Sequence, residues 1–440
     1  MGRFVHAVPE MGRRARLFAW RAVLASGLLL LQGVSSYAYP KPPMKMTRGG
    51  TSACTSMSEK RSLFPRADLL RQLALPLAGA AAFRAGAAIA VIGQPRLPPV
   101  TGPYGTVGVR VIRVTSEGGD SCRAKVFYPA LDDRQNGKDR GAVADAPYCT
   151  DGRETSDAMA GLVGFRQLGL SFLLAHLATA KSGCRLNAAP DSESTLPLLV
   201  YSHGYGGNMD MATYFVREIA SHGVVVVALE HADGTASCTR DADGSFLKFS
   251  PRLLSRDAQL SRRAQELLAG ACNTNLPSDL PIDYDRVFLG GHSYGGPACL
   301  TAAALQARQG SSDPSAAGPK IRGLLLHDPA VAMGRNLQLT RDCPTVSFTS
   351  DEYDAAGVIC WRTLHAKGCF HGNFVDAPLW APTWVMRPLS ALIPAAGSCD
   401  PAQMHSVLAR AAVAFMSGTS SLLVLDWVSF APVIGLFFFI

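Results

Sequence analysis

Gly291-His292-Ser293-Tyr294-Gly295 is the stretch that decides the fold of this 440-residue chain. The apolar run 286–290 precedes it and is typical of a buried strand, and the helix-prone run 298–305 follows it. A strand, a Gly-x-Ser-x-Gly turn and a helix in this order form a nucleophile elbow, where the glycines avoid collisions in a sharp turn. The N-terminus of such a helix favours negative charge developing nearby. The stretch therefore predicts that Ser293 is an exposed nucleophile.

The histidines that follow the elbow are the candidates for its base. A serine hydroxyl needs a histidine to take its proton and a carboxylate to orient that histidine, and in this kind of fold the chain order is Ser, acid, His. His371 lies in a glycine-punctuated loop, 367–374, from which a base can reach a serine. His365 falls on a short predicted helix and His405 on a final one, where we expect a partly exposed residue. We therefore expect His371 to be the base.

Spacing alone does not identify the carboxylate that orients the histidine. Asp328 follows the apolar run 321–327, and Asp351 follows the run 344–350, with Asp354 just beyond it. Both runs are typical of buried parallel strands, and active sites of open α/β sheets lie at the carboxyl ends of such strands. Either position would therefore suit an orienting carboxylate.

An acyl-transfer site also needs hydrogen-bond donors that hold the oxyanion. The apolar run 196–202 reads as another buried strand, and His203-Gly-Tyr-Gly-Gly207 follows it. Elbow enzymes recruit one backbone N–H from such a turn and one from the residue after the nucleophile. This predicts an oxyanion hole formed by the N–H groups of Tyr205 and Tyr294.

Three motifs in order give the chain a family resemblance. LPLLVYSHGYGG at 196–207, IASHGVVVVALEHADGTAS at 219–237 and the GHSYGG elbow resemble the platelet-activating factor acetylhydrolases of the plasma and intracellular type II kind. In that family an SHG-x-G loop, an ASHGF-V…EH-D-SA segment and a GHSFGG elbow occur in the same order. Residues 101–108 and 126–129 also look like that family's N-terminal strands. The resemblance spans roughly residues 99–380 and implies an α/β-hydrolase fold, a mostly parallel central sheet with helices on both faces.

The resemblance also implies the site residues. The family's acid stands in an LD setting after the strand that follows the elbow, which matches Asp328, and its histidine motif SVHQNF-D matches residues 369–376. Ser293 is then the nucleophile, His371 the base and later the acid, and Asp328 the orienting carboxylate, with Asp351 in reserve.

Two departures from the family accompany this match. The insertion 309–319 lengthens the segment after the elbow and reads as a surface loop because it is rich in turn formers. Tyr205 stands where the family often has leucine, which puts the shape of the acyl pocket in doubt rather than catalysis.

His231 and Asp233 follow another apolar strand and are interpreted as structural hydrogen-bonding residues near the pocket. His222 is interpreted as a helix cap or a surface residue.

The reaction that the resemblance implies is calcium-independent hydrolysis, through an acyl-enzyme, of the sn-2 acetyl or short or oxidised acyl ester of phospholipids. It implies no cofactor or metal, and a phospholipid substrate met at a lipid or membrane surface. The apolar segment 158–180 reads as a helix that touches lipid or caps the pocket. The alternatives are a carboxylesterase like dienelactone hydrolase that acts on soluble esters, and a non-catalytic binding protein of the same fold. The sequence does not indicate an oligomeric state.

The charge of the chain is concentrated at its start. The net charge is +8, but residues 1–66 hold eleven basic and two acidic residues, and the rest hold 31 basic and 32 acidic ones. Nucleic-acid binding is therefore not expected. The basic and apolar pattern of residues 1–38 predicts a secretory signal peptide, and 39–97 a targeting or linker segment that resembles a transit peptide. We expect secretion, with plastid import through a bipartite leader as the alternative.

The remaining boundaries come from composition. Residues 98–417 form the expected catalytic domain, and 418–440 an apolar tail that could insert in a membrane or dock on the enzyme. Eleven cysteines are present, and removing a leader that includes Cys54 leaves ten, an even number consistent with disulfides in an oxidising compartment. Their spacing does not suggest a zinc site.

Overall fold

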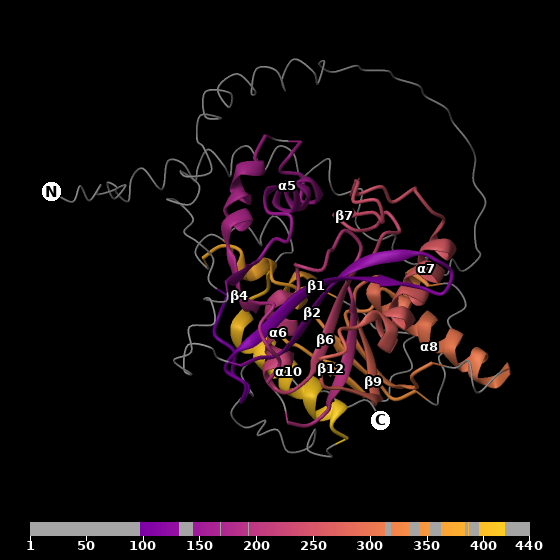
Figure 1. The fold of residues 1–440 in the computed structure, drawn as a ribbon. Coiled ribbons are helices and arrows are strands. Elements are labelled where there is room, and N and C mark those ends of the chain that lie inside the picture. The colour runs from indigo at the N-terminus through magenta and orange to yellow at the C-terminus, as the bar shows by residue number, and fades with distance from the viewer. Residues whose placement is uncertain are drawn as a thin grey trace, which may run out of the picture. The chain divides into compact units, whose positions relative to one another are not determined.

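The computed structural model of the chain is drawn in Figure 1. It describes residues 97–131, 144–167, 169–191, 193–312, 318–334, 343–352, 362–382, 386 and 396–418, all within one compact unit, residues 85–440. The predicted signal peptide, nearly all of the predicted targeting segment and nearly all of the predicted tail lie outside the described residues. No described helix has the length and apolar character needed to cross a membrane.

A ten-stranded sheet forms the centre of the domain, with the order β12-β11-β10-β9-β5-β6-β2-β1-β4-β3. Neighbouring strands from β12 to β6 all pair in parallel, and β2 joins this block antiparallel to β6. The strands are β1 Val107–Thr115, β2 Ser121–Pro129, β3 Asp145–Pro147, β4 Lys181–Leu186, β5 Leu196–Ser202, β6 Val225–Glu230, β9 Ile282–His292, β10 Ile321–His327, β11 Thr345–Thr349 and β12 Arg362–His365. A separate hairpin pairs β7 Cys238–Arg240 with β8 Phe246–Lys248.

Helices cover both faces of the sheet (Figure 1). They are α5 Arg153–Leu162, α6 Thr213–Ser221, α7 Arg256–Gly270, α8 Gly295–Ser312 and α10 Pro401–Met416, with short 3₁₀ turns η2 Ser171–Leu173, η3 Ala175–Thr179, η4 Asn273–Asn275, η5 Val331–Met333, η6 His371–Phe374 and η7 Ala377–Leu379. Successive side chains of a strand point to opposite faces. Along β5, Leu198 accordingly packs in a core with residues of α7 and α8, and Leu199 in a second core with residues of α6 and α10. The predicted α/β-hydrolase architecture is confirmed.

The segment 158–180 is not the single helix that we predicted. Helix α5 ends at Leu162, and the chain continues through turns in which Gly164 and Gly169 have φ angles of 79° and 70°. These left-handed positions end a helix because they break its repeating backbone geometry. The apolar residues beyond them pack in a third core with Tyr148 and Trp380. The segment is therefore a folded-back cap on the domain.

Three smaller predictions also need correction. His365 lies in strand β12 and not in a helix, because its segment pairs in parallel with β11. His405 does lie in a helix, α10, but it is fully buried there and not partly exposed. Helix α8 runs to Ser312, so the first residues of the predicted surface loop 309–319 are helical. Apolar length and turn-forming residues predict such boundaries only coarsely.

Candidate active site

Ser293 occupies the sharp turn between β9 and α8. Its φ angle is +55°, in the left-handed region that non-glycine residues rarely adopt. A Cβ atom on Gly291 would lie 2.4 Å from the carbonyl carbon of Gly295, and one on Gly295 would lie 2.2 Å from the carbonyl oxygen of Ser202. Both positions therefore require glycine. Ser293 is 5% exposed, so it is buried and not the exposed residue that the elbow pattern predicted.

The turn after β10 lies directly against this elbow. The N–H of Ser293 donates to the carbonyl of His327 (2.9 Å), and the N–H of Ala330 donates to the carbonyl of Ser293 (2.9 Å). A Cβ atom on Gly296 would lie 2.5 Å from the Cβ of Pro329. Asp328, at the centre of this turn, has a φ angle of +41°. The backbone thus fixes the position of Asp328 relative to the serine.

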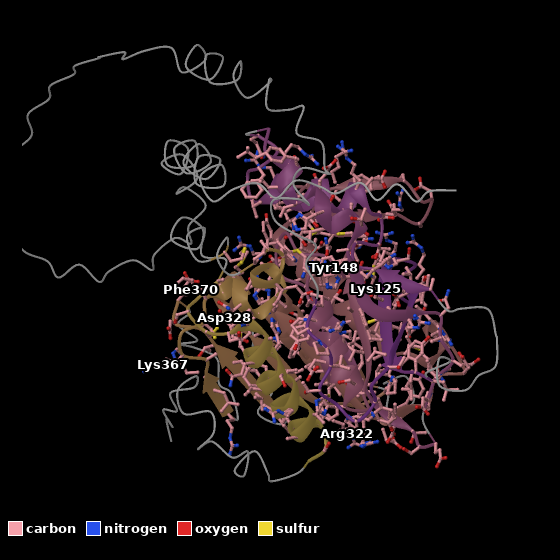
Figure 2. The ribbon with its side chains drawn as sticks, turned by 90° about the vertical axis from the view of Figure 1, so that its left-hand side faces the viewer. Lys125, Tyr148, Arg322, Asp328, Lys367 and Phe370 are labelled. Atoms are coloured by element: carbon pink, nitrogen blue, oxygen red, sulfur yellow. The ribbon has the colours of Figure 1, made fainter. Side chains whose placement is uncertain are left out.

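Asp328 and His371 form a hydrogen-bonded pair. His371 Nδ1 lies 3.1 Å from Asp328 Oδ2, and the carboxylate is completely buried. Asp328 also accepts the N–H of Ser350 at Oδ1 and the hydroxyl of Ser350 at Oδ2, both at 2.6 Å. Three hydrogen-bond donors therefore hold this carboxylate in place. Figure 2 shows Asp328 with Lys367 and Phe370, which precede His371 in its loop.

The backbone of the histidine loop is held by the end of strand β11. The N–H of His371 donates to Glu352 Oε2 (2.9 Å). Asp351, the reserve candidate for the acid, does not face His371. It bonds His365 Nε2 through Oδ1 and the N–H of Gly368 through Oδ2, both at 2.8 Å. The structure therefore places Asp328, and not Asp351, against the candidate base.

A second histidine packs on the first. The rings of His292 and His371 have centroids 4.5 Å apart, and His292 Nε2–H donates to the backbone carbonyl of His371 (3.2 Å). Burial lowers the pKa of His292 well below its ordinary value, and the neighbouring His371 adds to this effect. A neutral His292 can support the loop without competing with His371 for a proton. Sequence reasoning passed over His292, although its place inside the elbow pentapeptide was a signal.

The predicted oxyanion loop touches the serine. A Cβ atom on Gly204 would lie 2.9 Å from the Cβ of Ser293 and 3.1 Å from His292 Nδ1, so the loop backbone approaches the nucleophile closely. The rings of Tyr205 and Tyr294, the two predicted donors, meet edge to face at 5.8 Å. Tyr205 is 44% exposed and Tyr294 is buried. The structure thus brings the two predicted N–H residues together beside Ser293.

A buried arginine of α7 supports this loop from beneath. Arg263 donates through Nη1 to the carbonyl of His203 (2.7 Å) and through Nε to Asp233 Oδ2 (2.8 Å). Its guanidinium carbon lies 4.9 Å from the centre of the Tyr294 ring, within cation–π range. Burial opposes ionisation of Asp233, but the charge of Arg263 outweighs it and holds the pKa of Asp233 below its usual range.

The two histidines of this network are occupied by hydrogen bonds. His203 Nδ1–H donates to the carbonyl of Gly204 (2.7 Å), and His203 Nε2 accepts the N–H of His231 (3.2 Å). The His231 ring lies between Ser202 Oγ (2.7 Å) and Glu266 Oε2 (2.6 Å). Burial and the charge of Arg263 lower the pKa of both histidines well below the ordinary value. Both rings are therefore neutral parts of the scaffold under the oxyanion loop.

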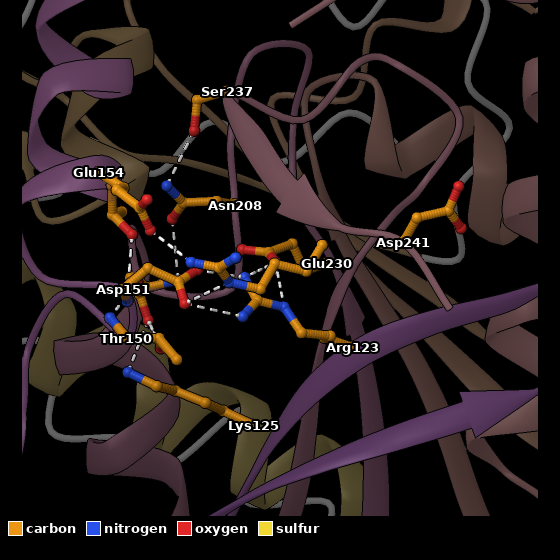
Figure 3. Close-up of polar contacts among 12 residues, drawn as sticks. Arg123, Lys125, Thr150, Asp151, Glu154, Asn208, Glu230, Ser237 and Asp241 are labelled. Carbon is orange, nitrogen blue, oxygen red and sulfur yellow. Dashed lines mark hydrogen bonds and ion pairs between the residues drawn. The ribbon is translucent and has the colours of Figure 1, made fainter. Parts of the chain in front are cut away.

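A second buried charge cluster anchors the cap (Figure 3). On strand β2, Arg123 pairs with Asp151 (2.7 Å) and Glu230 (2.5 Å), and Lys125 pairs with Asp210 (2.6 Å). Burial raises the pKa of Glu230 to about 7, against the opposing effect of Arg123. Asp151 lies two residues before the first residue of α5, so its pair with Arg123 fastens the start of this helix to the sheet.

The anchored cap reaches the oxyanion loop. The side chain of Leu162, the last residue of α5, lies 3.1 Å from the position that a Cβ on Gly206 would occupy. Across the described ranges, no group of three or more His, Cys, Asp or Glu side chains is arranged to hold a metal ion. The site therefore consists of a serine elbow, a histidine–carboxylate pair and a glycine-rich loop under an apolar cap.

The sheet order and the strand–turn–helix at Ser293 define an α/β-hydrolase fold. Among solved structures, the ferulic acid esterase from Streptomyces cinnamoneus shares this fold, with a TM-score of 0.54, 18% identity and coverage of 73% of this chain and 92% of that one. Residues 89–246 match the family model of platelet-activating factor acetylhydrolase, isoform II, so this region of the chain is similar to that family. The matched region contains the oxyanion loop and ends before the elbow.

Curated proteins show the same partial similarity. The platelet-activating factor acetylhydrolase of Gallus gallus is 27% identical over 144 residues, 33% of this chain and 32% of the relative. That of Canis lupus familiaris is 31% identical over 140 residues, 24% of this chain and 31% of the relative. A putative phospholipase A2 of Schizosaccharomyces pombe is 27% identical over 154 residues, 25% of this chain and 35% of the relative. The alignments thus span about a third of these relatives' lengths.

Proposed function

We propose that this protein is a serine esterase that hydrolyses the sn-2 acetyl, or short or oxidised acyl, ester of phospholipids without calcium. The observation that carries the proposal is the His371–Asp328 pair next to a left-handed Ser293, with Gly204 packed on the serine. A serine, a histidine and a buried carboxylate with these roles recur in acyl-transfer enzymes of unrelated folds.

The proposed reaction proceeds in two halves. Ser293 Oγ attacks the ester carbonyl while His371 takes its proton, and Asp328 stabilises the imidazolium that results. The N–H groups of Tyr205 and Tyr294 bind the oxyanion, and each such donor typically contributes about 10²- to 10³-fold to kcat. His371 then protonates the departing lysophospholipid oxygen. In the second half it activates a water molecule that releases the acyl group from Ser293.

The choice of a phospholipid rests on the family and on the surface near the site. Relatives that match this chain are named as platelet-activating factor acetylhydrolases and as a putative phospholipase A2. Tyr205 and Leu253 expose 44% and 49% of their surface, and Tyr205 packs edge to face on Phe249 at 5.4 Å. Exposed apolar groups beside a site suit a substrate that is met at a lipid surface. The same surface is the proposed contact with lipoprotein or membrane.

The test compares three esters with the full-length chain in the presence of a calcium chelator. The esters are an sn-2-acetyl phospholipid, a long-chain phospholipid and a soluble acetyl ester, each assayed with the wild type, Ser293→Ala and the control Ser245→Ala, whose serine is exposed on the β7–β8 turn. We expect turnover that favours the acetyl phospholipid and disappears only in Ser293→Ala. Turnover of the soluble ester alone would keep the site but assign the protein to the general carboxylesterases. Turnover that survives in Ser293→Ala would refute the site.

We also propose that residues 1–38 direct the chain into the secretory pathway, on the strength of their basic, apolar and small-residue pattern. Fusing residues 1–97 to a fluorescent reporter tests this in cells that contain secondary plastids. The proposal predicts reporter in the medium, and reporter inside plastids would favour the bipartite leader instead.

A further inference from the structure

Two cysteines near the histidine loop lie side by side although 30 positions separate them in the sequence. The Sγ atoms of Cys369 and Cys399 are 2.9 Å apart, and the Cys369 thiol donates a hydrogen bond to Cys399. All nine described cysteines are free thiols, so the disulfides expected from the cysteine count are not formed among them. Within the described part of the chain, this is the only pair of cysteines in sulfur-to-sulfur contact.

The backbone holds the two cysteines together independently of their thiols. The N–H of Cys399 donates to the carbonyl of Gly368 (3.1 Å). A Cβ atom on Gly397 would lie 2.0 Å from that same carbonyl oxygen, so glycine is needed for this approach. The N–H of Gly397 donates to Asn373 Oδ1 (2.6 Å). The segments 368–373 and 397–399 are therefore packed in a fixed arrangement before any bond joins the sulfurs.

This contact lies next to the candidate base. Cys369 is two residues before His371, and its carbonyl accepts the N–H of Asp351 (2.9 Å). Asn373 links both sides of the contact, because its Oδ1 accepts the N–H of Phe370 (2.8 Å) and its Nδ2 donates to Cys399 Sγ (3.3 Å). A covalent bond between the sulfurs would thus fasten the His371 loop to the start of α10.

We propose that Cys369 and Cys399 are a disulfide-forming pair whose oxidation locks the His371 loop onto the N-terminus of α10. This site is separate from the proposed esterase chemistry, and it would stand if the substrate assignment failed. The oxidant is a small-molecule disulfide.

The oxidation follows ordinary thiol–disulfide exchange. The Cys399 thiolate attacks one sulfur of the small disulfide, forms a mixed disulfide and releases one small thiolate. Cys369 then loses its proton to solvent and attacks Cys399 Sγ, which expels the second small thiolate. The cysteines lose two electrons and two protons in total, and the oxidant takes up the electrons to become two thiols.

The surroundings of the two sulfurs set this order of attack. Cys399 is half-buried and Cys369 is completely buried, so Cys399 is the thiol that an external disulfide can reach. The hydrogen bond from the Cys369 thiol lowers the pKa of Cys399, although burial opposes this. The same hydrogen bond, together with burial, raises the pKa of Cys369. Thiolate character and access together select the attacking cysteine.

Peptide mapping of the full-length wild-type protein tests the proposal without any activity measurement. The protein is reduced, freed of reductant, treated with oxidised glutathione, blocked with N-ethylmaleimide and digested without reduction. We expect one cross-linked peptide that joins Cys369 to Cys399 and is lighter by two hydrogen atoms than the sum of its parts. Cys272→Ser, which removes a half-buried thiol whose sulfur contacts Thr274, should give the same cross-link.

Two results would overturn the proposal. One is Cys399 recovered with maleimide or glutathione attached while the protein is folded, and the other is Cys399 joined to a different cysteine such as Cys360. A second measurement tests the locking itself. Reduction should lower the Tm of the oxidised wild type by several degrees and leave the Tm of Cys399→Ala unchanged, because a disulfide restricts the unfolded chain. An equal shift in both proteins would show that the bond does not lock the loop.

Discussion

Asp328→Asn tests the pairing of acid and base, and the structure predicts the size of its effect. Asp328 Oδ1 accepts the Ser350 N–H, so the single oxygen of an asparagine would stay on that buried donor. The asparagine NH₂ group would then face His371 Nδ1 and force the ring proton onto Nε2. A protonated Nε2 cannot accept the proton of Ser293. Variants with this wrong tautomer lose about 10⁴-fold in kcat, roughly 5.5 kcal/mol.

The side-chain amide of the asparagine could instead flip and restore the correct tautomer of His371. Its NH₂ group would then face the Ser350 N–H, so that two donors would meet and neither would have an acceptor. Leaving such a buried donor unsatisfied costs about 1–3 kcal/mol, a factor of about 5–150. The carboxylate charge that stabilises the imidazolium would also be missing. We therefore expect kcat to fall by about 10² to 10⁴.

The assay is steady-state hydrolysis of a soluble acetyl ester, with circular dichroism to confirm folding. The matched comparison is Asp351→Asn, which alters the neighbouring carboxylate that bonds His365. We expect Asp351→Asn to keep kcat near the wild-type value. A near-normal kcat in Asp328→Asn together with a large loss in Asp351→Asn would refute the pairing.

Two further predictions concern stability. Arg263→Met should destabilise the protein by about 3–5 kcal/mol in urea unfolding, because it leaves the buried Asp233 without its partner, and a change below about 1 kcal/mol would show that the ion pair is not structural. Asp376 is buried, and burial raises its pKa from 3.8 to about 8 despite hydrogen bonds from the Tyr214 N–H and the Tyr148 hydroxyl. Between about pH 4 and pH 8 the folded state then binds more protons than the unfolded state, so stability should fall as the pH rises, by up to about 1.4 kcal/mol per pH unit. Asp376→Asn should flatten this part of the curve, and an unchanged slope would contradict the assignment.

The elbow and the parallel core could be predicted because their signals are local. Gly291 and Gly295 are required by contacts with their own turn and with the adjacent strand, and the apolar runs that became β5, β9 and β10 are buried on both faces. Strands with that burial read as continuous apolar runs. The placement of Asp328 came from the family resemblance, since spacing alone left Asp351 open.

The supports of the site could not be predicted because they depend on long-range pairing. Ser350 and Glu352 hold Asp328 and His371 from the end of a neighbouring strand, and no local pattern marks them. Arg263 lies on α7, about 30 residues before the elbow, and looks like an ordinary charged helix residue until its burial is known. The segment 158–180 was mispredicted because apolar composition does not distinguish a helix from a compact set of turns.

The most direct measurement of the central claim is covalent labelling of the nucleophile. A fluorophosphonate probe reacts with serines activated by a histidine, and peptide mapping locates the adduct. The structure predicts one labelled peptide containing Ser293 in the full-length wild type, and loss of that label in Ser293→Ala and in His371→Ala. Labelling of a different serine, or equal labelling of Ser293 in His371→Ala, would contradict the account.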